Sequence, residues 1–258
     1  MRQSIRIWVL GVFAAGGLGA GVAAVFHYIP TVKQRQKNHF AVTDILNGLG
    51  NYSDMRRRLP PLTITDSHGK PLSSWRFTTS MIMVSGSMHR GYYTQYPQLD
   101  KPWNSLENQP YASGPHHEYP GSPPTYIDQT RPGNKARFVA VAGPETGFHQ
   151  KTQMPAEQLP RALLLITEVR DCTTHWMEPG GDLDVTTVPQ TIGAEGGIGP
   201  ASTAATEFYV GFADMSVWLL RTDVPFENLA KFFTISSAKQ NNRDALLGPF
   251  AVKVWKKS

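Results

Sequence analysis

Cysteine is almost absent from this chain, since Cys172 is the only one among 258 residues. A single cysteine excludes an intramolecular disulfide and excludes a metal cluster held by several thiolates. Such a thiol usually behaves as a small apolar side chain, so we expect Cys172 to be buried.

The sequence also lacks the short motifs of common catalytic sites. There is no Gly-x-Ser-x-Gly turn, no Walker loop and no His-Glu-x-x-His pair. The glycine-rich stretch 193–200 has neither the lysine nor the following helix of a phosphate loop, so it is interpreted as a flexible linker. We therefore expect no enzymatic activity, no catalytic residue and no bound cofactor or metal.

Charged residues make up only 17% of the chain, and the stretch 7–29 contains none. About 20 mostly apolar residues are enough to cross the hydrocarbon core of a bilayer. Basic side chains flank the stretch at Arg2, Arg6, Lys33, Arg35 and Lys37. The pattern predicts a single membrane-spanning helix, with a cleaved signal peptide ending near 22–24 as the alternative. Both interpretations export the rest of the chain.

The net charge of +5 comes mostly from scattered basic residues, with clusters at 56–58 and 256–257. Basic clusters of this kind bind nucleic acid or acidic lipid, or they form a solvated face beside an anionic membrane. We interpret them as a solvated face and expect no nucleic-acid partner.

The helical pattern continues beyond the apolar stretch. Val42, Ile45, Leu46 and Leu49 recur at the spacing of a helix that buries one side. Residues 6–52 are predicted to form one long helix, kinked at Pro30 and capped by Gly48 or Gly50. This gives three parts: a membrane anchor over 1–29, an amphipathic stem over 30–53 and an exported globular domain over 54–258.

Short apolar runs predict strands in the exported domain. We expect strands at 62–65, 136–142, 162–169 and 250–255, and a hairpin over 208–220 that turns at Ala213-Asp214. The run 76–84 is ambiguous between strand and helix, 226–235 is predicted as a short helix, and 108–133 as a long loop. The fold class is α+β.

Several motifs in order resemble one bacterial family. They are Leu-Pro-Pro at 59–61, Gly-Lys-Pro-Leu-Ser-Ser-Trp-Arg at 69–76, Leu-Asp-Lys-Pro-Trp-Asn-Ser at 99–105, Phe-Val-Ala-Val-Ala-Gly-Pro at 138–144, Trp-Met-Glu-Pro at 176–179 and Val-Gly-Phe-Ala-Asp at 210–214. Together they make the chain similar to the domain-of-unknown-function 1559 family, whose members are pilin-like and built like the type II secretion pseudopilin G. The resemblance covers nearly all of 28–235.

The resemblance implies a long N-terminal helix packed on an antiparallel β-sheet with long loops. It also implies a single-pass protein of the bacterial inner (cytoplasmic) membrane, with most of the chain extracytoplasmic. The residues it marks as structural are Trp75, Arg76, Asp100, Pro102, Trp103, Glu168, Trp176, Glu178, Asp182 and Asp214. Arg76 is expected to pair with Asp100 or Glu168, and Asp214 to hold the hairpin turn.

The first helix departs from a pilin in one important respect. Pilin-like proteins carry a peptidase site followed by a glutamate, whereas the nearest candidate here is Gly11-Val12-Phe13 and no glutamate follows in the apolar stretch. Gly17 and Gly21 instead form a small-residue motif that lets two helices approach in lipid. We expect a retained N-terminus, no pilus-like polymer, and lateral contact with another copy or with a pseudopilin.

Three other groups of residues allow alternatives. Glu178, Asp182 and Asp184 beside Gly180-Gly181 have the oxygen ligands of a calcium loop, and His116-His117-Glu118 is a weaker metal candidate. Trp75, Trp103, Trp176 and Trp218 are either core residues or a shelf for a glycan or peptide. The expected function is a membrane-anchored pilin-like structural or assembly protein of a type II secretion or type IV pilus-like system. The alternative is an exported envelope module that presents loops to a glycan or a protein client.

Overall fold

The structure is a computed structural model. It describes residues 18–86, 98–112, 127, 132–149, 155 and 158–256. For 18–36 and 83–86 only the backbone is described. The chain divides into two compact units, Met1–His39 and Phe40–Ser258, and the division falls inside the first helix. The second unit holds both sheets, and the description that follows is of this unit unless the first is named.

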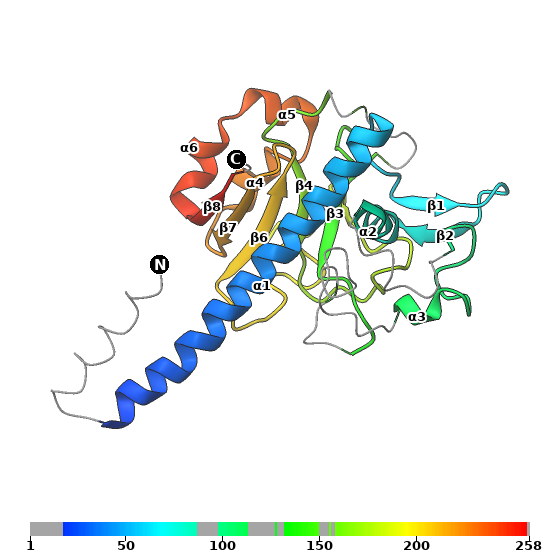
Figure 1. Cartoon of the computed structure of the whole chain (residues 1–258). Coiled ribbons are helices and arrows are strands. Elements are labelled where there is room, and N and C mark those ends of the chain that lie inside the picture. The colour runs from blue at the N-terminus through cyan, green and yellow to red at the C-terminus, as the bar shows by residue number, and fades with distance from the viewer. Residues whose placement is uncertain are drawn as a thin grey trace. The chain divides into compact units, whose positions relative to one another are not determined.

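The protein is a mixed α+β structure with a six-stranded sheet and a two-stranded sheet (Figure 1). The helices are α1 (Leu18–Arg56), α2 (Trp75–Gly86), α3 (Gln109–Ala112), α4 (Phe226–Ala230), α5 (Ile235–Gln240), α6 (Arg243–Leu247) and the 3₁₀ helix η3 (Gly248–Phe250). The strands are β1 (Thr63–Thr65), β2 (Pro71–Ser74), β3 (Phe138–Ala142), β4 (Leu164–Glu168), β5 (Leu183–Asp184), β6 (Glu207–Phe212), β7 (Val217–Arg221) and β8 (Ala251–Trp255).

The large sheet has the order β5-β3-β4-β6-β7-β8. Its pairs are antiparallel except β3–β5, where Val141 and Ala142 run parallel to Leu183 and Asp184. The expected purely antiparallel sheet is therefore wrong at this edge. The antiparallel β1–β2 pair stands apart and leads directly into α2.

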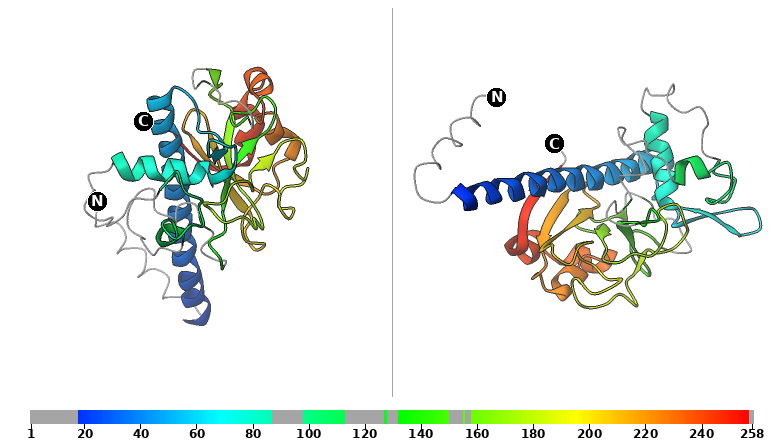
Figure 2. Two further views of the ribbon diagram at one scale, coloured as in Figure 1. Left: turned by 90° about the vertical axis from the view of Figure 1, so that its right-hand side faces the viewer. Right: turned by 90° about the horizontal axis from the view of Figure 1, so that it is seen from below.

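The part of α1 from Phe40 onward lies across one face of the large sheet (Figures 1 and 2). Val42, Ile45, Leu46 and Leu49 are all almost fully buried, as their spacing predicts. The contact is close, because a Cβ on Gly211 of β6 would lie 3.1 Å from Leu46 Cδ1. Glycine in this strand therefore leaves room for the helix.

The opposite face of the sheet is covered by the C-terminal segment that contains α4. Side chains alternate along a strand, so Phe212 points away from the face to which Gly211 belongs. Its ring lies 6.4 Å from that of Phe232, which follows α4. The central strands are thus buried on both faces, which explains their continuous apolar runs.

The end of α1 differs from the prediction. The helix continues past Gly48 and Gly50 to Arg56, and Arg57 ends it with a left-handed φ of 60°. Gly50 instead lets the helix pack closely against the β6–β7 turn, because a Cβ there would lie 3.1 Å from Met215 Cε. As predicted, the helix continues through Pro30.

Several local predictions are confirmed. Strands form within 62–65, 136–142, 162–169 and 250–255, the 208–220 hairpin turns after Phe212, and Cys172 is buried. The ambiguous run 76–84 is helical, in α2. The predicted helix 226–235 ends at Ala230, and α5 starts at Ile235. In the predicted loop 108–133, the described residues include the short helix α3.

The stretch 193–200 is fixed to the sheet rather than being a flexible linker. The Gly199 N–H donates to Glu168 O over 3.1 Å, and Arg170 Nη1 donates to Gly193 O over 2.6 Å. Ile198 is fully buried. The second half of the stretch, 197–200, is therefore buried against the sheet, and the glycines with left-handed φ values at 193, 196 and 199 supply turns.

The predicted membrane span begins outside the described residues, which start at residue 18. Among the helices that the structure does describe, none has the length and apolar character needed to cross a bilayer.

We predict that Gly211→Ala destabilises the domain by about 1–3 kcal/mol, the usual cost of overpacking a core. The added methyl would lie 2.7 Å from Ile166 Cγ1 and would also press on Leu46. The measurement is urea unfolding followed by circular dichroism. Gly248→Ala is the matched control, because a Cβ there meets nothing within 4 Å. Equal stability of the two variants would contradict the close helix–sheet contact.

Candidate functional site

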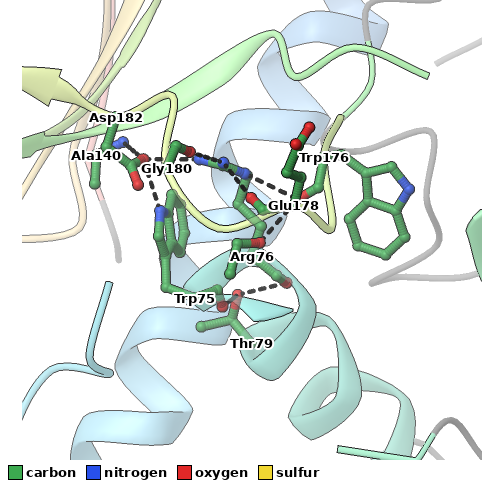
Figure 3. Close-up of polar contacts among 9 residues, drawn as sticks. Trp75, Arg76, Thr79, Ala140, Trp176, Glu178, Gly180 and Asp182 are labelled. Carbon is green, nitrogen blue, oxygen red and sulfur yellow. Dashed lines mark hydrogen bonds and ion pairs between the residues drawn. The ribbon is translucent and has the colours of Figure 1, made fainter. Parts of the chain in front are cut away.

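A buried arginine at the start of α2 forms the centre of a polar cluster. Arg76 is 0% exposed. Its Nε donates to Trp176 O over 3.0 Å, Nη1 to Asp182 Oδ1 over 2.7 Å and Nη2 to Gly180 O over 2.8 Å (Figure 3). The loop 176–182 therefore surrounds the guanidinium and takes up its charge.

Asp182 connects this loop to the large sheet. Its Oδ1 accepts from Arg76, from Trp75 Nε1 over 2.9 Å and from the Ala140 N–H of β3 over 3.0 Å. Leu183 follows directly and begins β5. The carboxylate thus fixes the start of the parallel strand, while its buried Oδ2 accepts no hydrogen bond from the described residues.

Two glycines allow the loop to turn around the arginine. Gly180 and Gly181 have φ values of 92° and 69°, in the left-handed region that side chains disfavour. A Cβ on Gly181 would also collide with Thr174 Oγ1. Glycine is therefore required here for conformation and for space.

These contacts correct two sequence interpretations. Arg76 pairs with Asp182, whereas Asp100 is exposed and Glu168 belongs to another pair. The calcium alternative also fails on geometry, because Asp182 Oδ1 faces a guanidinium and Asp184 Oδ1 accepts from Thr186. Within the described part of the chain, no group of three His, Cys, Asp or Glu side chains is placed to hold a metal ion.

Glu168 forms a second buried pair, in β4. It is 1% exposed, and its Oε1 accepts from Arg137 Nη2 over 2.7 Å and from the Ala201 N–H over 3.0 Å. Oε2 accepts from the Tyr209 N–H over 3.2 Å. Both oxygens have partners inside the protein, so this carboxylate holds β3, β6 and the 201 loop together.

Asp214 forms a third pair at the β6–β7 turn. Arg243 at the start of α6 binds it with two nitrogens, at 3.1 and 2.7 Å, and its guanidinium carbon lies 4.4 Å from the Phe212 ring centroid. Burial by itself would raise the pKa of Asp214, but hydrogen bonds from Arg243 and Ser216 outweigh this effect and lower it. The left-handed residue of the turn is Met215, not Asp214.

The four tryptophans do not form a shelf. Trp75, Trp176 and Trp218 are at most 2% exposed and belong to the core. Trp103 is half-buried, and its ring stacks on His175 at 4.7 Å. Only this tryptophan of the four is therefore accessible to a ligand.

The remaining motif residues shape the loop before α3. The Trp103 N–H donates to Leu72 O over 2.7 Å, and Pro102 O accepts from Asn108 Nδ2 over 3.0 Å. Asn108 is fully buried and also bonds both backbone groups of Gln98. Glu178, the last of these motif residues, lies in the loop 176–182 instead, where its Oε2 accepts a hydrogen bond from the His175 N–H over 3.1 Å.

Sequence reasoning did not identify the arginine partners. Arg137 and Arg243 carry no motif, and Arg243 follows the part of the chain that the family resemblance covers. Arg137 stands between the apolar residues Ala136 and Phe138, which is a weak signal of burial, whereas Arg243 stands between Asn242 and Asp244 and carries no such signal. Two candidate groups, His116-His117-Glu118 and Gly17 of the helix-packing motif, lie outside the described residues, and only the backbone of Gly21 is described, in α1.

Asp44 on α1 has an unusual environment for a carboxylate. It is half-buried, and no ion pair or hydrogen bond to its side chain is present among the described residues. Burial raises its pKa to about 6. The protonated form is therefore favoured in the folded state relative to the unfolded chain.

No known protein family matches the chain, and no curated protein or solved structure matches it either. The assignment of a function therefore rests on the residues and the geometry described above.

We predict that Arg76→Met destabilises the domain by about 3–5 kcal/mol, because it leaves Asp182 buried without its counter-ion. The measurement is chemical unfolding at pH 7. The control is Arg221→Met, which breaks the exposed pair with Asp223, whose side chains are 47% and 63% accessible. We expect a much smaller loss for the control, because water screens an exposed ion pair. A similar loss in both variants would contradict the structural role of the buried pair.

We predict that Asp44→Asn flattens the pH dependence of stability between about pH 4 and 6. The folded-state pKa of about 6 exceeds the ordinary aspartate value of 3.8, so the native state binds more protons in this window. Stability should then fall as pH rises through it, and the asparagine variant should be the more stable form at pH 7. Asp54→Asn changes an exposed carboxyl on the same helix and serves as control. Parallel curves for the parent and Asp44→Asn would disprove the effect.

Proposed function

We propose that this chain is a membrane-anchored, extracytoplasmic, pilin-like structural or assembly protein. The observation that carries the proposal is the continuity of α1, which runs from Leu18 inside the apolar stretch to Arg56. One helix thus bears both the uncharged segment and the buried stripe of the globular unit. This is the architecture that the family resemblance leads us to expect.

The buried polar groups support a structural role rather than catalysis. Arg76–Asp182, Arg137–Glu168 and Arg243–Asp214 are each directed inward and bonded to the protein itself. A catalytic acid or nucleophile needs a free face toward substrate. Such pairs fix loops and strand ends, as an assembly module requires.

A type II secretion or type IV pilus-like system is the proposed context, with the inner membrane as location. The apolar stretch lacks the glutamate that would meet the N-terminal amine of a neighbouring subunit. The proposed role is therefore that of an accessory subunit that contacts a pseudopilin or another copy laterally, with its N-terminus retained.

The second candidate, an exported binding module, is supported by one exposed loop. Leu106 is 81% exposed and Leu99 is 38% exposed, on the same loop as the half-buried Trp103. Exposed apolar side chains on a loop that also carries an accessible aromatic ring suit a protein or glycan surface. A Trp103→Ala variant that loses a client but keeps its melting temperature would favour this candidate.

We predict that the full chain stays in the membrane pellet after alkaline carbonate washing. Leu18→Arg combined with Val22→Arg should release it, because each arginine in the middle of a span costs about 2.5–3.5 kcal/mol. Thr31→Arg, beyond the apolar stretch, is the matched control and should remain in the pellet. Release of the unmodified chain would refute the anchor.

A further inference from the structure

The last strand, β8, forms one edge of the large sheet. It pairs with β7 on one side and has no second strand neighbour among the described residues. Edge strands normally carry protective features because their free backbone groups pair readily with other chains. The other edge is formed by β5, which is only two residues long.

The register identifies which backbone groups of β8 point outward. The Phe212 N–H donates to Ser216 O over 3.0 Å, so the backbone groups of Ser216 point toward β6. Backbone groups alternate in direction along a strand, so those of the next residue, Val217, point toward β8. Val217 pairs with Trp255, whose backbone must therefore face β7. The N–H and C=O of Val254 then point away from the sheet.

The outward groups of β8 belong to Val254, a half-buried residue. No hydrogen bond from elsewhere in the described chain reaches the Val254 backbone. Val252 is the extra residue of a bulge opposite Leu219/Leu220 and is 43% exposed. The bulge limits the free edge to a short stretch that ends near Lys256, which is also exposed.

The charges of this edge indicate what kind of strand fits it. Lys253 and Lys256 are exposed, and the sequence from Ala245 to the C-terminus contains no aspartate or glutamate. Pairing of β8 with a second copy about its centre would place Lys253 opposite Lys253, and like charges directly opposite are destabilising. A strand with carboxylates at these positions has the complementary charge.

We propose that the outer edge of β8 is a docking site for an extended acidic segment of a partner protein, which adds to the sheet as a further strand. Backbone hydrogen bonds at Val254 supply the attachment, and Lys253 and Lys256 select for carboxylates. This inference goes beyond the proposed anchoring and assembly role and does not depend on it.

The test uses the full chain in a mild detergent and two fluorescent, end-blocked hexapeptides. One peptide alternates valine with glutamate, and the other alternates valine with lysine. We expect the glutamate peptide to bind about tenfold or more tightly than the lysine peptide, as measured by fluorescence anisotropy. Its binding should also slow hydrogen exchange in residues 251–256, because the outward N–H of Val254 becomes bonded.

Three variants separate the edge from general charge attraction. Val254→Pro removes the outward N–H without removing a bond to β7, and it should weaken binding about tenfold, whereas Val254→Thr should bind normally. Lys253→Glu combined with Lys256→Glu should reverse the peptide preference, and it tests the site even if the proline variant unfolds.

The proposal is overturned if the glutamate peptide does not bind, if both peptides bind equally, or if binding leaves exchange in 251–256 unchanged. It is also overturned if the chain forms a concentration-dependent dimer in sedimentation velocity that Val254→Pro abolishes. That result would assign the edge to a second copy instead.

Discussion

The contact between the second half of α1 and the large sheet is the constraint on which the rest of the globular unit depends. The sheet needs cover on both faces because its central strands are apolar on both. Val42, Ile45, Leu46 and Leu49 provide this cover on one side. Gly211 and Gly50 let helix, sheet and the β6–β7 turn approach one another closely.

The three buried arginine–carboxylate pairs determine how the loops attach to this core. Buried ion pairs add little net stability, but breaking one leaves a charge without compensation. The pair Arg76–Asp182 therefore restricts the loop 176–182 to one path, and that path delivers β5 parallel to β3. The pair Arg243–Asp214 likewise restricts the path of the β6–β7 turn. The pairs thus account for the paths of these loops and for the position of β5.

The sequence predicted those features that depend on neighbouring residues. The stripe on α1, the β6–β7 hairpin and the last strand follow from local periodicity. The end of α1 was mispredicted because Gly50 is needed by Met215, more than 160 residues later in the chain. The partner of Arg76 was missed for the same reason, since Asp182 lies 106 positions away. The two-residue strand β5 has no periodicity, so only its contact with β3 defines it.

Thermal unfolding of two shortened chains tests most directly whether α1 completes the core. One chain contains residues 40–258, the second compact unit, and the other contains residues 57–258 and lacks the helix. We predict that the first unfolds in a single cooperative transition by circular dichroism, and that the second shows no cooperative transition because one face of its sheet is uncovered. A chain 57–258 that unfolds cooperatively at the same temperature as 40–258 would contradict the account.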